Sequence, residues 1–110
     1  MTSPIYFNVP EARDFLLEHQ YVYTIRKQRK DDSNQYTAAR WGSYYDFHTV
    51  GKVRVHPVLL LHEEGREVQL CDYVRYSGFH TVQEWLSSVK EWKHPMMLYR
   101  VELVDGIGVG

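Results

Sequence analysis

Residues 21–27 read YVYTIRK, and this short stretch decides which type of fold the chain can adopt. Aromatic or branched side chains occupy every second position, a spacing that is typical of a β-strand. Because side chains alternate across a strand, we expect Thr24 and Arg26 to lie on one face. Tyr21 and Tyr23 are then expected on the opposite face. The polar face of this strand is the first candidate for a binding site.

An amphipathic helix is predicted immediately before this strand. In residues 11–19, apolar side chains recur at positions i, i+3 and i+4, which places them on one face of a helix. Pro10 suits the first helical turn, where a backbone N–H would have no intrahelical partner. Residues 5–9 are β-prone, so the predicted order is strand, helix and strand.

The rest of the chain predicts further strands with a short helix between them. Residues 36–41 and 44–50 predict the two arms of an aromatic hairpin. Residues 52–62 give the clearest strand pattern, and residues 97–103 predict the last strand. Residues 68–76 predict a short helix that lies between these two strands in the chain.

A further helix is predicted to begin at a capping box. Thr81 and Glu84 have the spacing at which each side chain satisfies a free backbone N–H at a helix start. Apolar residues then follow with helical spacing over residues 82–92. Trp85 and Trp92 share this apolar face, which favours a position in the core for both over a role in a ligand site.

Length and composition favour one small domain of the α+β class. The 110 residues are 44% hydrophobic and 25% charged, which suits a single globular core. The net charge of −1 argues against a protein that coats nucleic acid through bulk charge, so a polyanion site must be a local patch. We expect the glycine-rich residues 105–110 to form a flexible tail.

Neither a membrane anchor nor a disulfide is expected. Residues 58–61 form the longest uncharged apolar stretch, far shorter than the roughly 20 residues that span a bilayer. Cys71 is the only cysteine, so no internal disulfide can form, and a reducing, cytoplasmic compartment is the natural interpretation. We interpret Cys71 as a small buried apolar residue.

Metal and cofactor chemistry are not expected either. The six histidines show no His-x-x-x-His spacing, and one cysteine cannot build a cysteine-based zinc site. Residues 62–64 read His-Glu-Glu, but the second histidine of a zinc-protease motif does not follow. We therefore expect no cofactor and no catalytic metal.

The order of these patterns resembles the ASCH domains of the PUA-like superfamily. The segments that carry the resemblance are residues 23–26, 51–53, 77–79, 81–86 and 98–101. The likeness is greatest to small single-domain archaeal members of unknown function. It implies a small β-barrel of about five to six strands with two to three flanking helices.

The resemblance also implies a cleft that receives RNA. In this family a Gly-x-Lys-x-x-Glu-x-Arg pattern lines the cleft, and Arg26 matches its last position. His19, Tyr21 and Thr24 stand where glycine, lysine and glutamate are expected. One branch, the acetylcytidine amidohydrolases, also has threonine at the glutamate position, but it needs the lysine that Tyr21 replaces. A structural ion pair with an acid such as Glu102 is the alternative role for Arg26.

The best candidate site combines positive and aromatic side chains, because cations hold phosphates and flat rings stack on bases. Its predicted members are Thr24, Arg26, Lys27, Arg29, Lys30, Arg40, Trp41 and Tyr44. We expect them to bind RNA, or single-stranded or modified nucleic acid, in a cleft between the barrel and the helices. The competing interpretation is a solvated loop in which Asp31 and Asp32 balance the basic residues.

Two other classes of function stay open. The first is a small hydrolase that acts on a modified nucleoside, with Tyr21, Thr24 and an acid in the pocket. Glu63 and Glu102 are the candidate acids. The second is a protein-interaction module in which residues 36–47 form a partner or homodimer surface.

Overall fold

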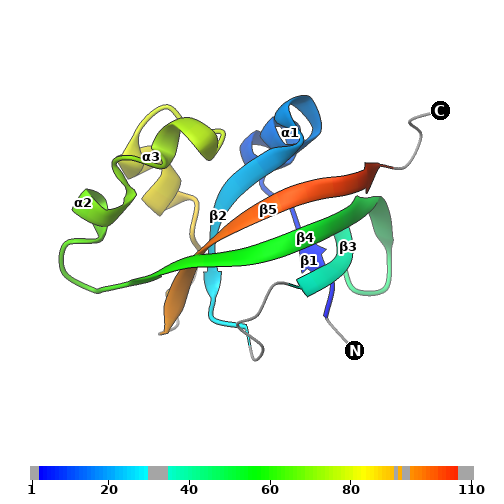
Figure 1. Cartoon of the computed structure of the whole chain (residues 1–110), viewed down its shortest axis with the longest axis horizontal. Helices are drawn as coiled ribbons and strands as arrows, with labels where there is room; N and C mark the ends of the chain where they lie inside the picture. Colours follow the sequence, from blue (N-terminus) through cyan, green and yellow to red (C-terminus); the bar gives the residue numbers. More distant parts are fainter. Residues whose placement is uncertain (1–2, 30–34, 91, 93–94, 107–110) are drawn as a thin grey trace.

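The computed structural model describes residues 3–29, 35–90, 92 and 95–106, and Figure 1 shows how they are arranged. Over these residues the chain forms five β-strands, three α-helices and one 3₁₀-helix. The elements are β1 (Ile5–Tyr6), α1 (Pro10–His19), β2 (Tyr21–Lys27), β3 (Gln35–Gly42), β4 (Phe47–Leu61), α2 (Arg66–Leu70), η1 (Val74–Tyr76), α3 (Val82–Ser87) and β5 (Met96–Gly106). The predicted α+β class is confirmed.

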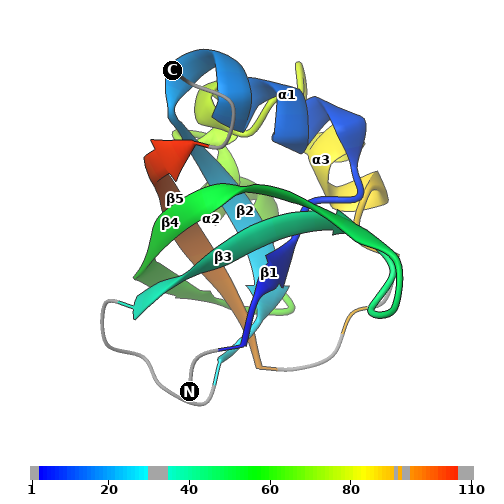
Figure 2. The same ribbon diagram turned by 90° about the vertical axis from the view of Figure 1, so that its right-hand side faces the viewer.

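The strands form one curled sheet with the shape of a half-barrel (Figures 1 and 2). Their order is β1-β3-β4-β5-β2, in which β1 is parallel to β3 and the other neighbours are antiparallel. Within the described part of the chain, β1 and β2 are the two edges and do not pair with each other. The sheet therefore stays open at the place where a closed barrel would join its first and last strands.

The longest strand, β4, joins most of the two segments that the sequence predicted as separate strands on either side of Gly51, but it leaves out residues 44–46 and 62. The prediction of a break was wrong, because the backbone continues in extended form through this residue. Register shifts beside Ala39, Lys52 and Pro57 mark β-bulges, which bend a strand while pairing continues. A single curved strand can thus pair with β3 on one side and β5 on the other.

The helix predicted over residues 68–76 was wrong in extent. Instead, α2 begins at Arg66 and ends at Leu70, and the separate turn η1 follows. Cys71 ends α2 with an exposed side chain, so the expectation that it is buried was also wrong. Its Sγ lies 3.1 Å from the carbonyl oxygen of Val68, one turn earlier.

The predicted capping box does begin α3. The Thr81 hydroxyl accepts a hydrogen bond from the Glu84 N–H at 3.1 Å. The helix ends at Ser87, well before its predicted end. The Ser88 hydroxyl donates a hydrogen bond to the Trp85 carbonyl at 2.6 Å, a local bond that competes with helix continuation. Among the described helices, none has the length and apolar character needed to cross a membrane.

Strand β5 extends further than the sequence predicted. Asp105 and Gly106 lie opposite Lys52 and Gly51 of β4. The first two residues of the predicted tail therefore belong to the sheet. Residues 107–110 lie outside the described part of the chain.

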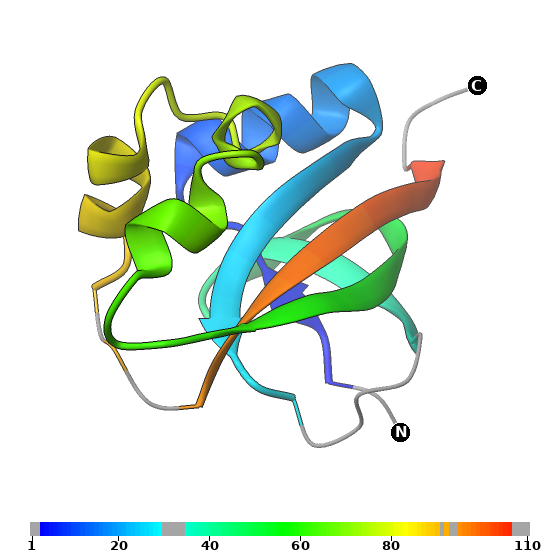
Figure 3. The same cartoon turned by 60° about the vertical axis from the view of Figure 1, so that its left-hand side comes forward.

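Two hydrophobic clusters hold the fold, one on each face of the sheet. The inner cluster packs α1 onto one face through Ala12 and Leu16. The outer cluster packs the segment from α2 to α3 onto one end of the opposite face, with Trp85 at its centre and Trp92 beside it. Trp85 is buried and Trp92 is partly buried, so the predicted core positions are confirmed. The exclusion of Trp85 from a ligand site was wrong, because Trp85 also lines the pocket described below. The rest of the outer face is left uncovered by helices (Figures 1 and 3).

Gly78 holds the loop before α3 against the start of α1. Its φ angle is +90°, a conformation that L side chains rarely adopt. A Cβ at this position would lie 2.2 Å from the carbonyl oxygen of Glu11. A larger residue therefore fits only if the loop and α1 move apart. The close approach also fixes the next residue, Phe79, beside α1.

Replacing Gly78 by alanine is expected to destabilise the fold more than replacing Gly65 by alanine. Gly65 has a similar φ of +84°, but no atom lies within 4 Å of the position that its Cβ would take. The left-handed conformation alone costs about 1–2 kcal/mol in Gly65→Ala. Gly78→Ala adds a backbone collision, for a total on the order of 3 kcal/mol or more. Urea unfolding of both variants measures the difference, and equal losses would contradict the close packing.

Candidate functional site

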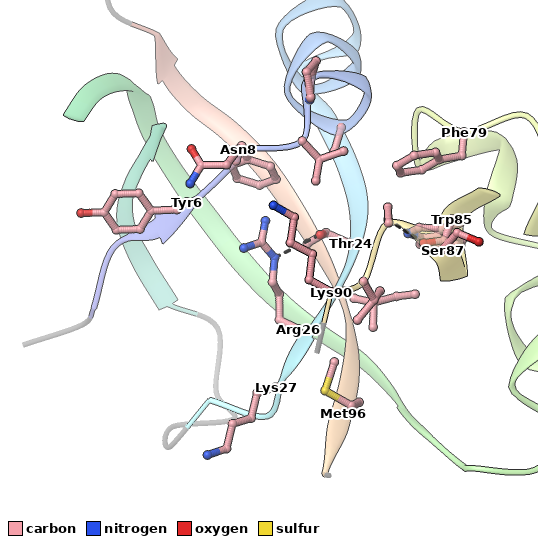
Figure 4. A pocket seen from close by; sticks show the side chains of 17 residues that line it. Tyr6, Asn8, Thr24, Arg26, Lys27, Phe79, Trp85, Ser87, Lys90 and Met96 are labelled. Atoms are coloured by element: carbon pink, nitrogen blue, oxygen red, sulfur yellow. Dashed lines mark hydrogen bonds between the residues drawn. The ribbon is translucent and has the colours of Figure 1, made fainter. Parts of the chain in front are cut away.

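A pocket of about 660 Å³ lies at the opening between the edge strands β1 and β2. Its walls come from β1 and the segment after it, the first turn of α1, β2, the loop before α3 and the chain around the end of α3. Figure 4 shows the side chains that line it. The volume is in the range of small-molecule binding sites.

Arg26 is the central polar side chain of this pocket. Thr24 and Arg26 lie on the same face of β2, as the alternation predicted, and the Arg26 Nε donates a hydrogen bond to the Thr24 Oγ1 at 3.2 Å (Figure 4). The guanidinium carbon lies 4.9 Å from the centre of the Phe7 ring. Among the described residues that line the pocket, none is an aspartate or a glutamate. The described part of the lining therefore does not neutralise the positive charge of Arg26.

The surroundings of Arg26 disfavour its charge. Its side chain keeps some accessible surface, but protein replaces most of the water around the guanidinium. This desolvation, with a smaller contribution from the positive charge of Arg29, lowers the pKa of Arg26 to about 10. Arg26 is still protonated at neutral pH, so the folded chain carries an incompletely solvated cation that an anion would stabilise.

Two lysines add positive charge to the same pocket. Lys27, from the end of β2, and Lys90, from the chain after α3, both contribute to its lining (Figure 4). Both side chains are exposed, so their ammonium groups can adjust to a ligand. Three cations without a carboxylate create a local positive potential in a chain whose net charge is −1.

Asn8 ties the rim of the pocket to the hairpin between β3 and β4. Its Nδ2 donates a hydrogen bond to the Gly42 carbonyl at 2.9 Å, and its Oδ1 accepts one from the Gly42 N–H at 2.6 Å. Gly42 has a φ of +116°, and a Cβ there would lie 2.5 Å from the Asp46 carbonyl oxygen. The hairpin tip is thus fixed relative to the pocket.

The structure divides the predicted site residues into separate groups. Thr24, Arg26 and Lys27 line the pocket. Arg40, Trp41 and Tyr44 lie on the hairpin beyond Asn8 and are not part of the pocket lining. Lys30 lies outside the described residues, as do Asp31 and Asp32, which the competing interpretation required.

The hairpin residues make their own aromatic contacts. The Trp41 ring stacks on His48 with a centroid distance of 4.4 Å, and the Arg13 guanidinium lies 4.8 Å from the Trp41 ring centre. Arg40 lies over the Phe47 ring at 4.0 Å. Trp41 remains 38% exposed. These rings form a surface beside the pocket and do not line it.

Arg29 anchors the chain instead of joining the pocket. Its backbone N–H donates a hydrogen bond to the Tyr99 hydroxyl at 2.7 Å. Its guanidinium donates a hydrogen bond to the Ser3 carbonyl. Arg29 thus connects the end of β2 with the segment before β1, and it does not line the pocket.

The residues considered for a hydrolase do not meet in the pocket. Thr24 lines it, but Tyr21, Glu63 and Glu102 do not. Glu102 instead accepts a hydrogen bond from Arg100 at 2.6 Å on the outer face of the sheet. This bond is the main cause that lowers the pKa of Glu102, and it also rules out the alternative ion pair between Glu102 and Arg26.

Asn8, Phe79 and Lys90 are pocket residues that the sequence did not identify. Lys90 belongs to the helix predicted over residues 82–92, but α3 ends at Ser87 and Lys90 lines the pocket together with β2. Phe79 reaches the pocket because the Ser77 hydroxyl accepts a hydrogen bond from its N–H at 3.1 Å. The Ser-Gly-Phe run at residues 77–79 was the one feature of the sequence that pointed to Phe79. No pattern in the sequence pointed to Asn8 or Lys90 as pocket residues.

Comparisons of the chain with protein-family models, with curated proteins and with solved structures gave no match.

Removal of the Arg26 charge is expected to leave stability unchanged or to raise it. The Arg26→Met variant keeps an unbranched apolar side chain and removes a cation without a carboxylate partner, for a gain of up to about 1 kcal/mol. Arg29→Met is the matched control and should lose stability, because it removes the bond to Ser3. Thermal melting of both variants tests this, and a large loss in Arg26→Met would show that Arg26 is structural.

Proposed function

We propose that this chain is a PUA-like module that binds RNA or another single-stranded nucleic acid and holds one nucleotide of the strand in the pocket. The observation that supports this most is Arg26, a guanidinium held by Thr24 in a pocket whose described lining has no carboxylate. A buried cation of this kind costs free energy unless an anion compensates it. Phosphate is an anion that a guanidinium binds strongly, through two parallel hydrogen bonds.

The pocket is larger than a phosphate alone requires. Its volume of about 660 Å³ leaves space for a ribose and a base next to the phosphate. Phe79 contributes a partly buried ring to the wall, and rings of this kind stack on bases without strong sequence preference. Asn8 and Ser87 supply polar groups for the edge of a base. A nucleotide therefore matches both the charged and the apolar parts of the lining.

The hairpin offers a path for the neighbouring nucleotides. Arg40, Trp41 and Tyr44 lie on it, and Asn8 joins the hairpin to the pocket rim. Tyr44 is 75% exposed, so its ring is accessible for stacking. The predicted basic and aromatic residues then act as two neighbouring parts of one binding surface.

A second candidate function is self-association through the hairpin, since Tyr45 is 93% exposed beside the exposed Tyr44. Large exposed rings at a loop tip suit a protein interface. Sedimentation velocity of the wild type should then show a dimer that Tyr45→Ser abolishes. A monomer over the whole concentration range would remove this candidate.

Nucleic-acid binding is tested by fluorescence anisotropy with a labelled oligouridylate at several salt concentrations. Arg26→Met should weaken binding by about tenfold and reduce the slope of log K against log salt by about one, because one phosphate contact is lost. Lys90→Ala should weaken binding less, by roughly two- to fivefold, because its exposed ammonium is more hydrated.

Arg66→Ala is the matched control for these variants. Arg66 is also an arginine over an aromatic ring, 4.2 Å from the centre of Trp92, but it lies outside the pocket lining. The Arg66→Ala variant should bind the oligonucleotide with the same affinity and salt dependence as the wild type. The proposal fails if Arg26→Met keeps the wild-type affinity and salt dependence.

A further inference from the structure

The sheet face opposite the pocket carries a second group of rings and cations. The helices cover one end of this outer face, and the segment around η1 packs beside β2, where Tyr73 and Tyr76 contact Tyr21 and Tyr23. The middle of β5 and β4 is uncovered by helices in two views (Figures 1 and 3). The side chains there point away from the inner cluster, because their chain neighbours Val22, Val53 and Val101 are buried in it. We call this surface the tyrosine–arginine face. It consists of Tyr21, Tyr23, Tyr36, Arg54, Arg100 and Glu102.

Four of these residues form one row across the sheet. Tyr36 of β3 lies opposite Arg54 of β4, and Arg54 lies opposite Glu102 of β5. Glu102 in turn lies opposite Tyr21 of β2. Neighbouring strands are about 4.8 Å apart, so the row is roughly 14 Å long. This length suits two or three stacked bases, as on other sheets that bind single strands.

The tyrosine rings at the β2 end of the row support one another. Tyr23 contacts Tyr73 and Tyr76 at centroid distances of 5.2 and 5.7 Å. Tyr21 contacts Tyr76 at 5.9 Å. All four rings keep part of their surface exposed. The rings are thus held in place before a ligand arrives, which reduces the entropy lost on binding.

The charges of the row and its surroundings leave a cation in excess. Arg100 holds the Glu102 carboxylate at 2.6 Å, while Lys52 lies opposite Asp105 in the register. Arg54 has no ion pair with any described carboxylate, and its Nε is buried without a hydrogen-bond partner. Arg54 lies opposite Glu102 and its charge also lowers the pKa of that carboxyl, but Glu102 is hydrogen-bonded to Arg100. Two guanidinium groups thus share one carboxylate among the described residues of this face, and an anion would compensate the second.

His56 is a neighbour of both arginines on the outer face, because it follows Arg54 by two positions on β4. The pKa of His56 is lowered first by burial and then by the positive charges of Arg54 and Arg100. His56 also lies directly opposite Arg100 in the register. Arg54 and Arg100 are thus diagonal neighbours in the register, about 7–8 Å apart, a separation that one phosphate group can bridge between two long side chains.

We propose that the tyrosine–arginine face is a second binding surface for single-stranded nucleic acid, whose bases stack on the tyrosines and whose phosphates contact Arg54 and Arg100. The combination of rings and cations favours this ligand over an acidic peptide, which needs the cations but not the rings. The surface is independent of the pocket, because Arg26 and Tyr23 point to opposite faces of β2.

The test is a titration of ¹⁵N-labelled protein with hexauridylate, followed by amide chemical shifts. Shifts are expected at Tyr21, Tyr23, Arg54 and Arg100, and they should persist in Arg26→Met. Tyr36→Leu and Arg54→Ala should each lower the apparent affinity obtained from these shifts by about fivefold or more. Tyr36→Leu removes a stacking ring, and Arg54→Ala removes a phosphate contact. Tyr36 is half-exposed, so Tyr36→Leu should keep the fold.

Arg66→Ala is again the control and should leave the shifts unchanged. Shifts confined to the pocket, or wild-type affinity in Arg54→Ala, would overturn this inference while the pocket proposal stands. Shifts confined to the tyrosine–arginine face would support this inference and contradict the pocket proposal. Hexaglutamate that binds this face as well as hexauridylate would also overturn it, because charge alone would then explain binding. The absence of shifts with hexauridylate would overturn both.

Discussion

The open edge of the sheet is the constraint on which the rest of the structure depends. β1 pairs with β3 over only two residues, and β2 has β5 as its single neighbour, so the first and last strands of the sheet remain apart. Helix α1 and the loop before α3 fill the space beside them, and Gly78 sets how closely these two segments approach. The remaining space is the pocket. Its walls surround Arg26 closely enough to displace most of the water from the guanidinium.

Strand β2 supplies both surfaces that we propose for ligands. Thr24 and Arg26 face the pocket, while Tyr21 and Tyr23 face the other way. A shift of one residue in the pairing with β5 would exchange these faces and bury the wrong side chains. The regular register from Tyr21 to Lys27, without a bulge, therefore fixes the position of every group on the strand.

Local patterns in the sequence were sufficient for β2, α1 and the start of α3, because period and capping act over a few residues. They failed where distant contacts decide the structure. The bulges that carry β4 through Gly51 depend on its neighbours in the sheet. The end of α3 is a different case, because the bond from the Ser88 hydroxyl to the Trp85 carbonyl is local and has no effect on the apolar period. Proximity in the sequence also placed Arg40 and Trp41 with Arg26, although the curled sheet assigns them to different surfaces. Lys90 could be assigned only once the path of the chain after α3 was known.

The pairing of β2 with β5 has a consequence for synthesis of the chain. β2 is made early, but its only neighbour in the sheet is the last strand. Nearly the whole described chain must be looped to bring them together, which makes this pairing one of the slowest contacts to form. While the chain is still being translated, the exposed edge of β2 and its tyrosines have no neighbouring strand. Both proposed surfaces can therefore form only after β5 has left the ribosome, so a nascent chain without β5 has neither.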